Sequence, residues 1–64
     1  MFKLIYGDFN NTHTMKVYSD TERKGYRVMI EKKDTKELAM LCYVEDKEEA
    51  KTLGHIELDQ INCR

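Results

Sequence analysis

The stretch Leu38-Ala39-Met40-Leu41-Cys42-Tyr43-Val44 decides the fold, because every one of its residues is apolar. A strand that is apolar at successive positions is typical of burial on both faces. In a chain of 64 residues, one helix covers only one of those faces. The stretch therefore predicts a strand with a helix on one side and a second cover on the other. That cover is the chain's own C-terminal segment, a second copy or a different molecule.

Three further strands are predicted upstream, because apolar and polar residues alternate there with a period of two. They lie within residues 2–7, 12–19 and 26–31, and turn-forming or short polar sequences separate them. Short loops usually join antiparallel neighbours. We therefore expect an α+β fold in which a four-stranded antiparallel meander carries one C-terminal helix on one face. Residues 1–64 are expected to form a single small domain.

The helix is predicted to begin after Asp46, because Asp46 and Glu49 have the spacing of a capping box. Ala50 and Leu53 provide its inner face. Gly54 is typical of a left-handed helix end, so we predict a helix from Lys47 to about Leu53. The segment from residue 55 to residue 61 then forms a short strand or a further helical turn, with three apolar anchors: Ile56, Leu58 and Ile61.

The alternation also divides the strand residues between two faces of the sheet. The residues expected beneath the helix are Leu4, Met15, Val28, Ile30, Met40, Cys42 and Val44. The opposite face is the expected partner-binding surface, because Tyr, Met and Arg are enriched at the centres of protein interfaces. Its members are Ile5, Tyr18, Met29, Leu41 and Tyr43, with Lys16 and Arg27 among its cations.

Composition favours a folded chain that carries no membrane span. Charged residues make up 36% and hydrophobic residues 41%, there is no Pro, and the net charge is −1. Charge is uneven, because residues 1–33 carry +3 and residues 34–64 carry −4. No apolar run approaches the length of a membrane span and no signal-peptide pattern opens the chain, so we expect a cytoplasmic location.

The leading functional hypothesis is a small intracellular protein that acts by occupancy. It either self-associates through the open sheet face or masks a site on a larger protein. The small size and the preference for Lys over Arg, eight to three, suit a phage-type inhibitor of a host protein.

Two other hypotheses use the same surface. A single-stranded nucleic-acid binder would stack bases on Tyr18 and Tyr43 and contact phosphates through Lys3, Lys16 and Arg27. A slightly acidic chain is atypical of such binders. The third hypothesis is a small-ligand sequestering oligomer with its pocket between chains.

Catalysis and metal binding find little support in the sequence. His13 and His55 lie far apart and outside any pattern of metal ligands, and no Gly-rich phosphate loop occurs. Cys42 and Cys63 are too few for a disulfide framework, so reduced thiols are expected, with Cys42 packed as a small hydrophobe. We expect no enzyme, no cofactor and no metal.

Overall fold

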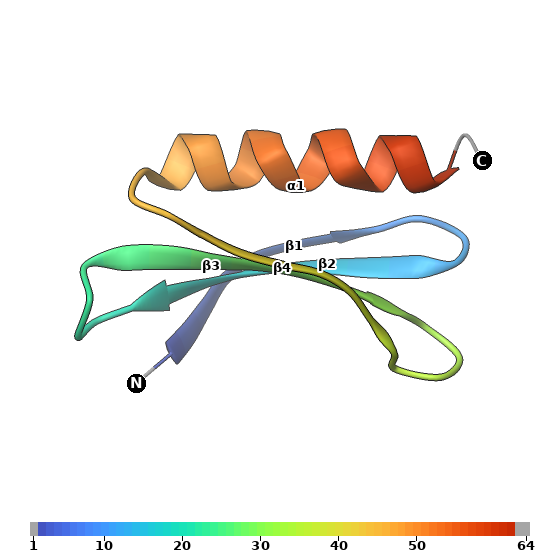
Figure 1. Cartoon of the computed structure of the whole chain (residues 1–64), viewed down its shortest axis with the longest axis horizontal. Helices are drawn as coiled ribbons and strands as arrows, with labels where there is room; N and C mark the ends of the chain where they lie inside the picture. The colour runs from blue at the N-terminus through green and yellow to red at the C-terminus, as the bar shows by residue number, and fades with distance from the viewer. Residues whose placement is uncertain (1, 63–64) are drawn as a thin grey trace.

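The computed structural model describes residues 2–62 and confirms the α+β fold. Four strands form one open antiparallel sheet in the order β1-β2-β3-β4, and a single helix packs across one face (Figure 1). The elements are β1 (Phe2–Phe9), β2 (His13–Asp20), β3 (Gly25–Lys32), β4 (Leu38–Val44) and α1 (Lys47–Asn62). Each strand pairs with its sequence neighbour, as short connections between alternating segments predict.

The core lies between α1 and the two central strands. Met15 and Val17 of β2 and Val28 and Ile30 of β3 have no exposed surface. Because these residues alternate along paired strands, all four point to the same side of the sheet. The helix covers them with Ala50, which is fully buried, and with Leu58, which is 4% exposed. The half-buried residues packed around this core are Ile5, Tyr6, Tyr26, Met40, Cys42, Val44 and Ile61.

The predicted helix end at Gly54 is wrong, because α1 continues through Gly54 to Asn62. Gly54 is buried and has no positive φ, so it is an ordinary helical residue rather than a left-handed cap. A Cβ built at Gly54 would lie only 2.9 Å from the Sδ and Cε atoms of Met15. The glycine therefore lets the helix approach the sheet closely at its middle, and the helix runs on beyond it to bury Leu58.

The predicted N-terminal cap of the helix is confirmed. The Oδ2 atom of Asp46 accepts a hydrogen bond of 3.0 Å from the backbone N–H of Glu49, and Glu48 and Glu49 lie in the first turn. A carboxylate at this position satisfies a donor that the helix itself leaves unpaired, and it favours the positive end of the helix dipole.

We expect Asp46→Ala to lower the free energy of unfolding by about 1 kcal/mol, because the cap of a helix contributes about that much. Urea denaturation followed by circular dichroism measures the loss. The matched control is Asp59→Ala, which removes an exposed acid from the same helix and makes no cap; a loss of equal size in both variants would contradict this role of Asp46.

Polar contacts tie β1 and its turn to the helix. The Tyr6 hydroxyl hydrogen bonds to Nε2 of His55 at 2.6 Å, and Nδ1 of His55 lies 3.3 Å from Oδ2 of Asp8. At the end of the same strand, the side-chain amide of Asn10 donates to the backbone carbonyl of Leu58 at 3.1 Å. The second half of α1 is thus fixed to the sheet by hydrogen bonds as well as by the core.

Candidate functional site

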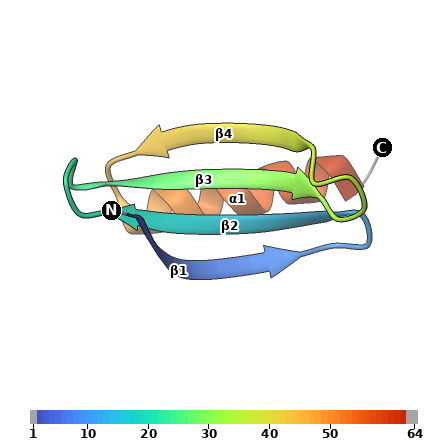
Figure 2. The same cartoon turned by 90° about the horizontal axis from the view of Figure 1, so that it is seen from below.

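The face of the sheet that α1 leaves uncovered is the candidate functional site, and Figure 2 views the molecule from this side. We call it the open face. The strand register places its residues in three rows that run across the sheet. These rows are Leu4-Tyr18-Arg27-Tyr43, Gly7-Lys16-Met29-Leu41 and Phe9-Thr14-Glu31-Leu38, with Phe2 beyond the first.

Apolar side chains line both edges of the open face, and charged residues occupy its middle. The edge strands provide Phe2, Leu4 and Phe9 from β1, and Leu38, Leu41 and Tyr43 from β4, each between 40% and 67% exposed. The central strands provide a polar lane around Lys16, Arg27 and Glu31. This pattern, apolar groups around a few charged ones, differs from a sheet face that only meets water.

Most of the residues predicted for this surface lie on it. The register confirms the placement of Lys16, Tyr18, Arg27, Met29, Leu41 and Tyr43. In the first row, Arg27 pairs with Tyr18 on one side and with Tyr43 on the other. Their role in binding a partner stays a prediction.

The predicted placement of Ile5 on this face is wrong, because a bulge in β1 interrupts the alternation between Leu4 and Tyr6. A bulge adds one residue to one strand and reverses the faces of the residues that follow. As a result, Ile5 packs against the core, whereas Leu4, which was predicted beneath the helix, is 54% exposed on the open face. Lys3 pairs with Ser19, on the helix side, so it does not join the cations of the open face.

Sequence reasoning missed Phe2, Leu4, Phe9 and Leu38 as members of the open face. A signal for the bulge was available, because Ile5 and Tyr6 are adjacent bulky apolar residues in an otherwise alternating strand. Leu38 lies beyond a second irregularity, between Ile30 and Glu31 of the facing strand.

Arg27 is the electrostatic centre of the open face. Its guanidinium carbon lies 3.8 Å from the centroid of the Phe2 ring and 4.9 Å from that of the Tyr18 ring. The two rings meet edge to face, with centroids 6.4 Å apart. The Nε atom of Arg27 is buried and has no hydrogen-bond partner among the described residues. Cation–π attraction to the two rings therefore stabilises this guanidinium, a role that a carboxylate usually fills.

Two further cations lie over rings at the ends of the open face. The guanidinium of Arg23 is 5.7 Å from the Tyr43 centroid, and the ammonium of Lys33 is 4.4 Å from the Phe9 centroid. Within residues 2–62, neither of them nor Arg27 forms an ion pair. The face therefore carries positive charge that no acid of the described chain neutralises.

Lys16 is the exception, because its ammonium lies 3.1 Å from the Oε1 atom of Glu31 on the facing strand. The hydrogen bond to this carboxylate, together with its charge, raises the pKa of Lys16 above its ordinary value. The positive charge of Lys16 and the negative charge of Glu31 thus cancel in the middle of the open face.

The C-terminal segment does not cover the open face with any described residue. Leu58 and Ile61 belong to α1 and pack on the opposite side of the sheet, and Ile56 is 48% exposed on the helix. Of the three covers expected for the second face of β4, the chain's own C-terminal segment is thus not provided by residues 55–62; cover by a second copy or by a different molecule stays a prediction. The helix side of β4 is half-buried, whereas Leu41 and Tyr43 on the open face are 46% and 49% exposed.

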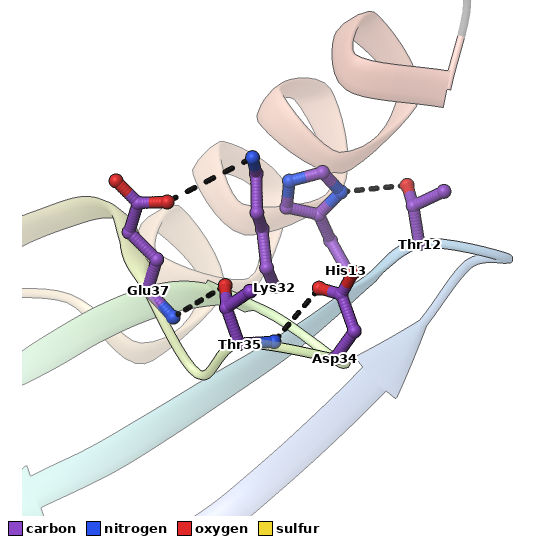
Figure 3. A network of polar contacts seen from close by, with 6 residues as sticks. All are labelled: Thr12, His13, Lys32, Asp34, Thr35 and Glu37. Carbon is purple, nitrogen blue, oxygen red and sulfur yellow. Dashed lines mark hydrogen bonds and ion pairs between the residues drawn. The ribbon is translucent and has the colours of Figure 1, made fainter.

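An open hollow of about 770 Å³ lies at the end of the sheet where two hairpin turns meet the helix. The residues that line it are Asn11, Thr12, His13, Lys32, Lys33, Asp34, Ala39, Glu57 and Ile61. Figure 3 shows that several polar groups here bind one another: the Thr12 hydroxyl and His13 Nδ1 at 2.7 Å, and Lys32 Nζ and Glu37 Oε2 at 3.8 Å. These polar groups bind one another and hold the turns in place, so they are less available to a ligand. The hollow is therefore a weaker candidate site than the open face.

Cys42 lies on the helix side of β4, half-buried beside the core, as expected for a small hydrophobe. Burial, followed by the charge of Glu57, raises the pKa of its thiol. Cys63 lies outside the described residues. Residues 2–62 contain no cluster of three or more His, Cys, Asp or Glu side chains that would hold a metal ion.

Comparison with known proteins adds no evidence on function, so a functional assignment rests on the open face. Within the described part of the chain, no helix combines the length and the apolar character that crossing a bilayer requires. No protein family model, no curated protein and no solved structure matches the chain.

Proposed function

We propose that the chain is a small protein-binding module that acts by occupancy, covering a site on another protein with its open face. The observation that carries the proposal is the position of the exposed large hydrophobic side chains. Six of the seven found among residues 2–61, all except Ile56, lie on the open face. Large apolar side chains that gather on one face of a small protein usually mark a contact site.

The size of the open face suits such a role. Four strands of seven or eight residues, at about 3.3 Å per residue and about 4.8 Å between strands, give a flat area of about 500 Å² for the sheet. The side chains make the surface uneven, so its accessible area is larger than this flat value. The face is therefore close to the roughly 800 Å² that each partner buries in a stable interface of standard size.

The charge of the open face indicates the chemistry of the partner. Arg23, Arg27 and Lys33 lie over aromatic rings without a carboxylate partner in the described chain. A protein surface that places acidic residues opposite these cations and apolar residues opposite the two edge strands complements this arrangement. Arg and Tyr are also the residue types that contribute most when they are desolvated at the centre of an interface.

Single-stranded nucleic acid is a weaker match to the same face. Cations already lie over Phe2, Tyr18, Tyr43 and Phe9 at 3.8 to 5.7 Å, so these rings are not free platforms for bases. The exposed leucines of both edge strands have no use in stacking. A cytoplasmic location and an inhibitory, phage-type role belong to the proposal and follow from size and composition alone.

The proposal is tested by photo-crosslinking in cells. A photoreactive phenylalanine analogue at Met29, on the open face, should crosslink the chain to a protein that is rich in surface acids. The matched control is the same analogue at Ile56, which is 48% exposed on the helix and should give no such product. Equal products from both positions, or a product from Met29 that nuclease removes, would overturn the proposal.

Arg27 should be essential for binding that protein. Once the crosslinked protein is purified, we expect Arg27→Ala to raise the dissociation constant by about thirtyfold, as expected for a residue at the centre of an interface. Arg27→Lys keeps the charge but loses the planar stack on Phe2, so its affinity should also fall. Titration calorimetry measures both values; full affinity in the Arg27→Lys variant would show that charge alone matters.

A further inference from the structure

The outer edge of β4 has no protection against pairing with another strand. Its backbone pairs with β3 on one side, and it ends the sheet on the other. All seven of its residues are uncharged. Exposed edges in natural sheets are usually blocked by charged residues, Pro or a bulge, because a free edge is a template for another chain.

The opposite edge shows these protective features clearly. β1 carries Lys3 and Asp8, and its bulge lies between Leu4 and Tyr6, in the interior of the strand. The irregularity in β4 lies at its start, next to Ala39, and leaves the five residues from Met40 to Val44 in regular register with β3. Of the two edges of the same sheet, only β4 therefore offers a regular, uncharged segment.

The helix leaves this edge accessible. The core residues that α1 covers lie on β2 and β3, and in Figure 2 the helix lies behind these two central strands while β4 extends beyond it. No described segment lies outside β4 in the sheet.

We propose that the edge of β4 pairs antiparallel with β4 of a second copy of this chain, so that two sheets join into one sheet of eight strands. Two-fold symmetry makes such an edge complementary to itself. The axis passes beside Cys42, the middle residue of the regular segment. This inference goes beyond the open-face proposal and does not depend on it.

In the pairing around Cys42, the helix sides of the two β4 strands point the same way, and so do their open-face sides. Met40 then lies opposite Val44 of the other copy on the helix side, and Leu41 lies opposite Tyr43 of the other copy on the open face. Such directly opposed aliphatic and aromatic pairs stabilise antiparallel strands. The two helices lie about 19 Å apart if strands are spaced by about 4.8 Å, well beyond the roughly 10 Å at which helices collide.

The charges that flank β4 favour a second copy as the occupant. Lys36 lies two residues before the strand and Glu45 follows it directly, and neither forms an ion pair within residues 2–62. Glu37, between Lys36 and the strand, is already paired with Lys32 at 3.8 Å. An antiparallel arrangement places the Lys36 end of one copy near the Glu45 end of the other, at both ends of the junction. The two open faces then lie on the same side of the joined sheet and form one larger surface.

The test measures the mass of the purified full chain in a Cys63→Ser background, without any partner. Sedimentation equilibrium should give twice the 7.6 kDa of one chain. Mild oxidation at alkaline pH should trap a dimer through Cys42, because directly opposed residues of antiparallel strands have Cα separations within the range of a disulfide. A concentration-independent monomer would overturn the proposal.

Matched variants locate the contact. Leu41→Lys with Tyr43→Lys adds two cations to β4 at exposed positions and should give a monomer. Leu4→Lys with Phe9→Lys adds two cations at exposed positions of β1 and should leave the dimer intact. Circular dichroism checks that both fold. A dimer that survives the first change, or is lost equally in both, would show that the contact lies elsewhere.

A charge exchange provides a test that leaves the strand itself unchanged. Glu45→Lys alone should weaken the dimer several-fold, and adding Lys36→Glu should restore it. Failure of the restoration would contradict the antiparallel pairing. All of these outcomes are independent of crosslinking from Met29, so the two proposals fail or succeed separately.

Discussion

Replacing Gly54 with valine is expected to destabilise the protein strongly. A Cβ at this position meets the Sδ and Cε atoms of Met15 at 2.9 Å and its Cγ atom at 3.0 Å. Met15 is fully buried, so its side chain has little free space into which to move. Valine adds two more methyl groups to this clash. Overpacking of this kind costs about 3 kcal/mol, close to the roughly 3 to 5 kcal/mol that a core of this size supplies.

Urea denaturation followed by circular dichroism measures the effect. Thr52→Val places the same side chain at an exposed position of the same helix and should change the free energy of unfolding by less than about 0.5 kcal/mol. Combining Gly54→Val with Met15→Ala frees the contested space, so part of the loss should return. A wild-type denaturation midpoint for Gly54→Val would show that the end of the Met15 side chain moves aside without cost, and would contradict this prediction.

Truncating Ile30 to alanine should produce the second large loss. Ile30 lies on a central strand, faces α1 and has no exposed surface. Removing three carbons from such a site leaves a cavity and costs about 2 to 5 kcal/mol. We therefore expect Ile30→Ala to be at best marginally folded, as seen in its urea denaturation curve.

The neighbouring residue is the matched control. Met29 is half-buried on the open face of the same strand, so Met29→Ala should cost less than half as much as Ile30→Ala. Comparable losses from the two variants would mean that the open face is covered in solution, by a second copy or by another part of the chain.

The strand order and the start of the helix could be predicted from the sequence because both depend on local signals. Alternating apolar residues defined the strands, short loops defined their order, and Asp46 with Glu49 marked the helix N-terminus. The end of the helix depends on tertiary structure. A glycine can end a helix or allow a close approach, and only the position of Met15 against Gly54 decides between them.

The open face was predictable where the alternation is regular, as in β2 and β3. It was mispredicted around Ile5, because a single inserted residue reverses the faces of the strand and its sequence signal, the adjacent Ile5 and Tyr6, is weak. The position of β4 at the edge of the sheet was not predicted, for another reason. The sequence of an apolar strand does not show whether the strand lies at the edge of a sheet or at its centre. Only the strand order shows that one edge of β4 lacks a neighbouring strand.

The position of α1 at the end of the element order affects how the chain folds while it is being synthesised. The strands of the sheet leave the ribosome before the segment that covers their core side. Until residues up to 62 have emerged, Val17, Val28 and Ile30 lack the helix that buries them. Apolar surface of the nascent sheet is thus open to aggregation over this interval, which ends when the helix packs onto the sheet.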